Sequence, residues 1–338
     1  MNIDMDTTSV SDDLGHGVKM RDQGVLVTGG AGFIGSNLVD LLMETGHTVY
    51  VLDDLSTGKM GNIQRWLSED NFNFIQGDIR TPLDHVLTPH KLGGGPPITT
   101  VFHLAARVDV TSSFQDPRLD LEVNYLGTMN VLDHAVRSGV KKVVFTSSAA
   151  VYGDTDQLPI SEMAPLGPLS PYGLHKMASE HLMEIYRQQY GLKYVTARLF
   201  NVFGPRQDPG NPYSGVISKF IHRSIKGEPL LIYGDGEQTR DFIYVRDVAE
   251  VLLKVASSEL IGTLNVATGK ETTVNDIADT VARISGKELR KVNLPERKGE
   301  IKRSVADVAT LREKLFHEEA TDLREGLKET SRWLEKQF

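Results

Sequence analysis

Short apolar runs alternate with helical patterns through the first 200 residues of the chain. The runs predict buried strands at 25–27, 48–52, 72–75, 100–104, 142–146 and 194–198. Apolar residues at helical spacing predict helices from Phe33 onward, at 117–138 and at 172–190. Because strands and helices alternate, we expect a parallel sheet with helices on both of its faces.

Beyond residue 200 this alternation is lost. Pro205, Pro209 and Pro212 lie in a long irregular segment. Further helices are predicted at 214–226, 246–257, 274–285 and 321–337, with short strands between them. We expect a smaller α+β lobe here, lying over the carboxyl edge of the sheet, where ligands of open α/β folds bind.

The turn after the first strand has the sequence Thr28-Gly29-Gly30-Ala31-Gly32-Phe33-Ile34-Gly35. Gly29 allows a tight turn, Gly32 lets the backbone approach a pyrophosphate, and Gly35 lets helix and strand pack closely. The N–H groups and the dipole at the start of the helix favour two phosphates. Glycines alone often mark only a turn, but a strand before them and a helix after them indicate a dinucleotide site.

Two acids follow the second predicted strand, Asp53 and Asp54. A carboxylate at this place accepts hydrogen bonds from the adenosine ribose and repels a 2′-phosphate. The sequence therefore predicts NAD rather than NADP as the cofactor. The fold class that follows is α/β, a Rossmann-type doubly wound parallel sheet with a smaller C-terminal α+β substrate lobe.

The 338 residues suffice for one large domain and a smaller one. We expect a Rossmann domain at 23–202, to which 232–258 contributes, and a substrate-binding lobe at 203–338. Residues 1–22 are polar and acidic, which predicts a disordered extension that is neither signal peptide nor anchor. The segment 93–97 contains three glycines and two prolines and is expected to be a surface loop.

Charge and composition exclude several classes of function. A net charge of −8 argues against nucleic acid or an anionic membrane as the main partner. The chain has no cysteine, which excludes disulfides, thiolate metal sites and cysteine nucleophiles. No spacing of acids and histidines predicts a metal site, and no apolar stretch is long enough to span a bilayer. We expect a cytoplasmic protein.

The candidate catalytic residues follow the fifth predicted strand. Tyr172 and Lys176 are four residues apart at the start of a helix and project from the same face. A nearby ammonium and the positive nicotinamide ring would favour the phenolate form of Tyr172, which then acts as a base. Ser148, which follows the strand, can bond a substrate oxygen. A solvated helix face and a serine-rich capping loop are the alternatives for these residues. His103 and His175 are expected to be packing or cofactor-edge residues.

At this point the chain resembles the extended short-chain dehydrogenase/reductase family, and specifically its NAD-dependent nucleotide-sugar 4-epimerases of the UDP-glucose/UDP-N-acetylglucosamine type. The motifs that carry the resemblance run from about residue 24 to the C-terminus. They include the glycine turn, Gly77-Asp78-Ile79-Arg80, His103-Leu104-Ala105-Ala106, Arg198-Leu199-Phe200-Asn201 and Gln238-Thr239-Arg240-Asp241.

The resemblance implies a role for each matching residue. The catalytic residues would be Ser148, Tyr172 and Lys176. The cofactor would be bound by Gly29, Gly32, Phe33, Ile34, Gly35, Asp53, Asp54, Leu55, Ser56, Thr57, Gly58, Asp78, Ile79, Leu104, Ala105, Ala106, Asn124, Tyr172, Lys176 and Phe200. Within this set, Asp78 matches the residue at the adenine edge and Asn124 the family's structural asparagine. The UDP-sugar would be bound by Ser148, Tyr172, Asn201, Val216, Tyr233, Gln238, Arg240, Arg297, Glu300 and Ser304.

Departures from related enzymes favour plain epimerisation. Relatives that eliminate water or decarboxylate carry acids beside the serine, where this chain has Ala149 and Ala150. Uronic-acid epimerases tend to have threonine at the place of Asn201. Ser304 matches the position that governs room for a 2-N-acetyl group, and its small side chain suggests that acetylated sugars fit.

The resemblance thus implies an isomerase that inverts C4 of UDP-hexoses, both plain and N-acetylated, through a transient 4-keto sugar. Another UDP-sugar enzyme on this fold, namely a glucuronate epimerase or decarboxylase, a dehydratase or a 4-ketoreductase, remains an alternative. A non-catalytic NAD-binding protein is a second one. Family analogy implies a homodimer through the helices at 117–138 and 172–190, whose exposed faces could equally be solvated.

Overall fold

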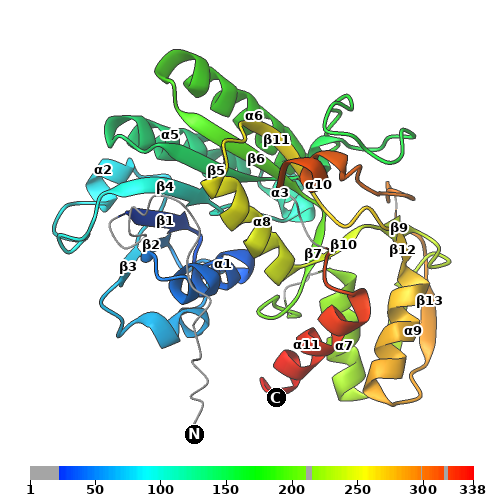
Figure 1. Ribbon diagram of the computed structural model, residues 1–338. Helices are drawn as coiled ribbons and strands as arrows, with labels where there is room; N and C mark the ends of the chain where they lie inside the picture. Colours follow the sequence, from blue (N-terminus) through cyan, green and yellow to red (C-terminus); the bar gives the residue numbers. More distant parts are fainter. Residues whose placement is uncertain (1–22, 211–214, 298, 316–318) are drawn as a thin grey trace, which may run out of the picture.

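The computed structural model describes residues 23–210, 215–297, 299–315 and 319–338 (Figure 1). The predicted N-terminal extension at 1–22 and Pro212 lie outside these residues. Seven parallel strands form the central sheet in the order β11-β6-β5-β4-β1-β2-β3. Their bounds are β1 Gly24–Thr28, β2 Thr48–Asp53, β3 Phe72–Gln76, β4 Ile98–His103, β5 Lys142–Ser148, β6 Lys193–Leu199 and β11 Gly262–Val266.

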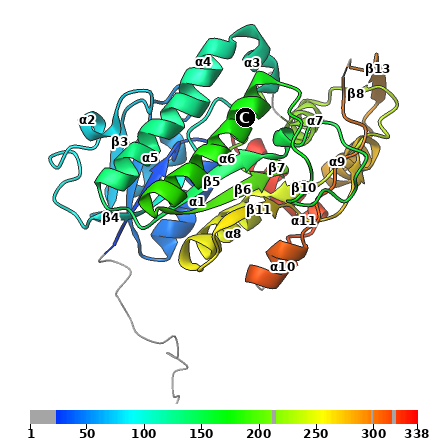
Figure 2. The same ribbon diagram turned by 90° about the horizontal axis from the view of Figure 1, so that it is seen from above.

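Helices cover both faces of the sheet, as the alternating pattern predicts. On one face lie α1 (Phe33–Glu44) and α8 (Val245–Ser257), which pack against each other (Figure 1). On the other lie α5 (Gly127–Arg137) and α6 (Pro171–Tyr190) (Figure 2). Each face has its own apolar core, with Leu38 and Val248 in the first and Leu132 and Met183 in the second. Burial on both faces explains why the strands are continuously apolar.

The predicted helix at 117–138 is present as three consecutive segments. These are α4 (Pro117–Leu121), a π-helical segment η4 (Glu122–Leu126) and α5. Asn124, in the π-helical segment, forms two hydrogen bonds with the backbone of Arg107: it accepts one from the N–H and donates one to the carbonyl. A π-helical turn often marks a functional site, and here it packs against α6.

The smaller lobe has its own core. It contains α7 (Val216–Lys226), α9 (Val274–Ser285) and α11 (Leu323–Glu335), together with β8 (Leu230–Tyr233) paired with β13 (Lys291–Leu294). Thr273 and Asp276 form a capping box at the start of α9, which has the bounds predicted for this helix. Two further strand pairs connect the lobe to the sheet, β7 (Asn201–Phe203) with β10 (Phe242–Tyr244) and β9 (Thr239–Arg240) with β12 (Thr272–Thr273). Because β7 follows the carboxyl end of β6, the lobe lies at the carboxyl edge of the sheet (Figure 1).

The boundary between the two parts differs in detail from the expected one. Of the segment 232–258, α8 packs on the sheet, whereas β8 belongs to the lobe. The seventh strand, β11, comes from beyond residue 258 and pairs with β6. The remaining elements are short: η2 Met60–Asn62, η3 Gln64–Trp66, α2 Leu83–Val86, α3 Val110–Gln115, η5 Ala149–Val151 and α10 Ala309–Leu315. The segment 93–97 contains no helix or strand. In the described part of the chain, no helix has the length and apolarity needed to cross a membrane.

Candidate active site

Hydrogen bonds connect the carboxyl ends of β1, β4 and β5 into one rigid edge. His103, the last residue of β4, is bonded to Thr28 Oγ1 at 2.8 Å and to Thr128 Oγ1 at 2.9 Å. Thr146 Oγ1 donates to the carbonyl of His103 at 3.1 Å. Burial lowers the pKa of His103 to about 3, so it stays neutral. His103 is therefore a packing residue that aligns the three strand ends.

The glycine turn occupies one side of this edge. Gly29 has φ of +72°, and a Cβ on Gly35 would lie 2.1 Å from the carbonyl oxygen of Gly29. No side chain caps the start of α1, and its first turn has no acidic residue. The first N–H groups of the helix, those of Phe33 and Ile34 among them, have no partner within the helix. An uncapped, uncharged helix start fits the pyrophosphate of a dinucleotide.

Asp53 lies beside this turn as the last residue of β2. Its carboxylate accepts hydrogen bonds from the N–H groups of Ala31 and Leu55, and burial raises its pKa. A Cβ on Gly58 would lie 2.6 Å from Asp53 Oδ1, so only glycine leaves the space beside this oxygen open. Asp54 is exposed and accepts bonds from Ser56. Leu55, in the loop after β2, has φ of +61°, and Thr57 lies in the same loop. The residues present thus fit an adenosine ribose.

The other predicted cofactor residues divide into two groups. Leu104, Ala105 and Ala106 follow β4 and are half-buried, and the backbone of Ala105 lies beside Gly29. Phe200, which follows β6, and Ile79 are buried.

The other group is already paired. Both oxygens of Asp78 accept bonds from Arg80, so an adenine must share this carboxylate. The side-chain amide of Asn124 is bonded on both its oxygen and its nitrogen to the backbone of Arg107, which fits the family's structural asparagine; its place among the cofactor residues stays a prediction.

Tyr172 and Ser148 meet at the carboxyl end of β5. Ser148 is the last residue of β5, and Tyr172 lies in the first turn of α6, whose start is capped by Ser170. The Ser148 hydroxyl is near enough to the Tyr172 phenol to lower its pKa, and Ser148 Oγ accepts a hydrogen bond from the N–H of Ala150 at 3.2 Å. Burial raises the pKa of the Tyr172 phenol to about 12 and outweighs the opposing influence of Ser148.

Lys176 lies one helical turn further along the same face of α6. Its Nζ donates to the carbonyl of Thr146 at 2.9 Å and lies 6.0 Å from the centre of the Tyr172 ring. Burial lowers the pKa of Lys176 to about 8, against the opposing influence of Asp120 and Glu180. In the chain by itself, burial is thus the largest influence on the pKa of Tyr172. The expected shift towards phenolate, which also requires the positive nicotinamide ring, stays a prediction for the NAD-bound protein.

The predicted substrate residues of the lobe gather around Tyr233. The guanidinium of Arg297 lies 3.8 Å from the centre of the Tyr233 ring, and Gln238 donates to the Tyr233 carbonyl. Arg240 Nη2 lies 3.5 Å from Glu300 Oε1, and the other oxygen of Glu300 is buried without a hydrogen-bond partner. Such a buried, unsatisfied acceptor fits a ligand hydroxyl. A pocket of about 180 Å³ lies here, lined in part by Tyr233, Gln238 and Glu300.

The three remaining substrate residues lie around this group. Asn201 begins β7 and is exposed, and Val216 begins α7. Ser304 is buried in the segment that follows Glu300, where the neighbouring Val305 carbonyl accepts a hydrogen bond from Ile160.

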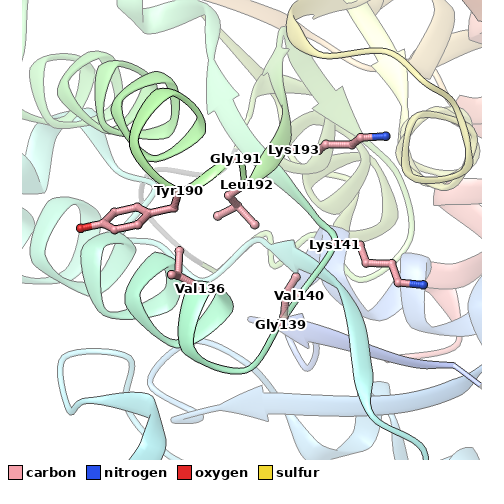
Figure 3. A pocket seen from close by; sticks show the side chains of 8 residues that line it. All are labelled: Val136, Gly139, Val140, Lys141, Tyr190, Gly191, Leu192 and Lys193. Carbon is pink, nitrogen blue, oxygen red and sulfur yellow. The ribbon is translucent and has the colours of Figure 1, made fainter.

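A larger pocket of about 410 Å³ is found elsewhere (Figure 3). It is lined by Val136, Gly139, Val140, Lys141, Tyr190, Gly191, Leu192 and Lys193. Lys141 and Lys193 lie at the amino ends of β5 and β6, whereas Ser148 lies at the carboxyl end of β5. The larger pocket is therefore at the opposite edge of the sheet from the candidate active site. No group of histidines and acids that could hold a metal ion occurs among the described residues.

Sequence analysis missed two buried acids behind the catalytic residues. Glu180 accepts hydrogen bonds from Ser147 and Arg198, and Asp120 accepts one from His175 at 2.6 Å. The signal for Glu180 was available, because it continues the four-residue spacing of Tyr172 and Lys176 on α6. Asp120 had no such signal, since its partner lies 55 positions away.

The chain matches known proteins over most of its length. Residues 25–267 match the model of the NAD dependent epimerase/dehydratase family. A putative UDP-glucose 4-epimerase of Methanocaldococcus jannaschii is 39% identical, covering 92% of this chain and 98% of the relative. The solved structure of a UDP-N-acetylglucosamine 4-epimerase from Methanobrevibacter ruminantium, in complex with UDP-N-acetylmuramic acid, has a TM-score of 0.88 at 38% identity, covering 94% of this chain and 100% of that one. The Thermus thermophilus UDP-glucose 4-epimerase complex with NAD has a TM-score of 0.82 at 38% identity, covering 92% and 98%.

Proposed function

We propose that this chain, which belongs to the NAD dependent epimerase/dehydratase family, is an NAD-dependent isomerase that inverts C4 of UDP-hexoses. The observation that carries the proposal is the meeting of Ser148, Tyr172 and Lys176 at the edge that also holds the uncapped start of α1. Bound NAD supplies a reversible hydride acceptor for C4 of the sugar.

The chain's own residues would handle the proton and hold the substrate. Tyr172 would take the proton of the sugar 4-hydroxyl as a phenolate, a form that the Lys176 ammonium and the positive nicotinamide ring would favour over the buried phenol. Ser148, which lies beside Tyr172, would bridge to the same sugar oxygen. Lys176 holds a positive charge behind the phenol at neutral pH, because its pKa of about 8 leaves most of it protonated. Burial of Tyr172 and Lys176 and partial burial of Ser148 keep water away from the reacting groups.

Inversion at C4 requires that the protein binds the diphosphate tightly and makes few contacts with the sugar. Arg240 and Arg297 provide planar, always charged donors that match diphosphate oxygens. The sugar must turn over between the two halves of the reaction, so few specific hydrogen bonds to it are expected. Ala149 and Ala150 follow Ser148 and cannot transfer protons, which favours epimerisation over elimination.

Both plain and N-acetylated hexoses are substrates in this proposal. The support is the small, buried side chain of Ser304 on the segment next to Glu300. The decisive experiment incubates the purified protein separately with UDP-glucose, UDP-N-acetylglucosamine and UDP-glucuronate, without added NADH, and resolves the products. An isomer of equal mass supports the proposal. A decarboxylated, dehydrated or reduced product, or no turnover, contradicts it.

The proposed enzyme is a homodimer through α4, η4 and α6. Leu121, Leu126, Leu174 and Ile185 are large apolar residues exposed on these neighbouring helices. A second copy of the chain would cover them. Sedimentation velocity should show a dimer for the wild type and a monomer for Ile185→Glu. A monomeric wild type would mean that these faces are solvated.

A further inference from the structure

Three consecutive residues of β5 contact three residues spaced by four on α6. Ser148 lies beside Tyr172, the Thr146 carbonyl accepts a hydrogen bond from Lys176, and Ser147 Oγ donates to Glu180 Oε1 at 2.5 Å. Residues spaced by four lie on one face of a helix. The strand and the helix are therefore connected at three successive points, and only the first two involve the proposed catalytic residues.

The third connection is anchored from outside the helix. Arg198, on the neighbouring strand β6, donates to both oxygens of Glu180, with the shortest distance 2.6 Å. The two side chains are each only 6% exposed. A buried ion pair of this kind is held in one geometry, because breaking it would leave an unpaired charge in the core.

The anchor extends to β11, the edge strand next to β6. Arg198 Nη1 donates to Tyr152 Oη and to the carbonyl of Glu162, both at 3.0 Å. Tyr152 in turn donates to Asn265, on β11, at 2.6 Å. Glu180 is thus fixed by a network that includes β5, β6 and β11.

We propose that Glu180 is a positioning residue that, through Ser147 and Arg198, sets the register of α6 against β5 and hence the approach of Tyr172 to Ser148. Glu180 lies two turns beyond Tyr172 and has no role in binding in the proposed function, on which this inference rests. Because α6 is one continuous helix, a small axial shift at Glu180 is transmitted to Tyr172. Misplacement of reacting groups by about 1 Å costs on the order of a hundredfold in rate.

The test removes the link between Ser147 and Glu180 while leaving the ion pair in place. In Ser147→Ala, we expect kcat for the UDP-hexose to fall about tenfold, with KM for the substrate within twofold of the wild type. Hydrogen exchange at the amides of Gly173 and Leu174, in the first turn of α6, should become several times faster. Ser147→Thr keeps the hydroxyl and should restore both quantities to within threefold of the wild type.

Thr330→Val is the matched control. Thr330 is a buried hydroxyl that donates to Gly326 within α11, in the smaller lobe, so its loss should leave kcat and exchange in α6 unchanged. Glu180→Gln should lower kcat further, and its melting temperature shows how much is lost through folding. If Ser147→Ala matches Thr330→Val in kcat and in exchange, the positioning role is overturned. If the wild type epimerises nothing but exchange in α6 still responds to Ser147→Ala, the proposed function fails and the positioning role survives.

Discussion

The catalytic edge of the sheet and the smaller lobe hold their polar residues in opposite ways. Tyr172 is 7% and Lys176 3% exposed. Tyr172 lies beside Ser148 of β5, and Lys176 donates a hydrogen bond to the Thr146 carbonyl of the same strand. In the lobe, Arg240 and Glu300 are 3.5 Å apart and each is nearly one-fifth exposed. The guanidinium of Arg297 stacks on the Tyr233 ring.

This difference matches the two tasks of the proposed reaction. Proton transfer at a sugar hydroxyl requires groups that are fixed to within a fraction of an ångström. The lobe, by contrast, must bind a diphosphate firmly while the attached sugar turns over. Long cationic side chains that can change conformation suit the binding of such a diphosphate, because they keep contact with oxygens whose positions change. Substitutions at the edge should therefore change kcat, and substitutions in the lobe should change KM.

Tyr172→Phe should have the largest effect. It removes only the phenol oxygen, so the ring still fills its buried position and the fold is retained. We expect kcat to fall by about a thousandfold or more, since positioned acid–base groups contribute about 10²–10⁴. Binding of UDP, measured by titration calorimetry, should stay within twofold. Near-normal epimerisation by this variant would remove Tyr172 from the chemistry.

Lys176 should determine the alkaline limb of activity. Its pKa of about 8 means that the ammonium is present below this pH and is lost as the pH rises through it. Because the ammonium favours removal of the phenol proton, kcat/KM should fall above about pH 8. Lys176→Arg keeps its charge at all these values.

The pH profile of the arginine variant therefore tests the assignment. Its activity should be lower throughout, because the guanidinium is larger and its contact with the Thr146 carbonyl changes, but the alkaline limb should move well above pH 8. A limb at the same pH in both proteins would show that another group titrates there.

Arg297→Leu tests whether the smaller lobe binds the diphosphate of the UDP-sugar. Loss of a charge-assisted hydrogen bond costs about 1.5–3 kcal/mol, or about 10- to 150-fold in affinity. We expect KM for the UDP-sugar and Kd for UDP to rise by at least tenfold, while kcat stays within threefold. Arg283→Leu, an exposed arginine of α9, is the control and should change neither constant. If kcat falls as strongly as in Tyr172→Phe, the proposed division between edge and lobe is wrong.

Local patterns predicted the sheet well and the contacts between elements poorly. The strand that begins at Gly24, the glycine turn and the helix at 274–285 follow from nearby residues, and each is confirmed. The pairing of β11 with β6 and the ion pair of Arg198 with Glu180 depend on tertiary packing, which periodicity does not encode. The pKa values at the site were missed for the same reason.

Asn124 illustrates this limit within the site. The resemblance implies a structural asparagine, but the sequence does not show what its amide binds, which is the backbone of Arg107, 17 positions earlier. Only the conformation of the loop after β4 reveals this. The roles assigned to individual cofactor and substrate residues remain predictions, and the variants described here test several of them.

Ser304→Tyr should have the smallest and most selective effect. Ser304 is buried, and a tyrosine would occupy space that a 2-N-acetyl group is proposed to fill. We expect KM for UDP-N-acetylglucosamine to rise about tenfold, while UDP-glucose is turned over within threefold of the wild-type rate. Ser304→Ala is the matched control and should keep both activities, because it only makes the residue smaller. Equal losses with both sugars would indicate a general disturbance of the segment around Glu300. The selective loss would show that the lobe decides which sugar fits, whereas the edge acts on any sugar whose 4-hydroxyl it meets.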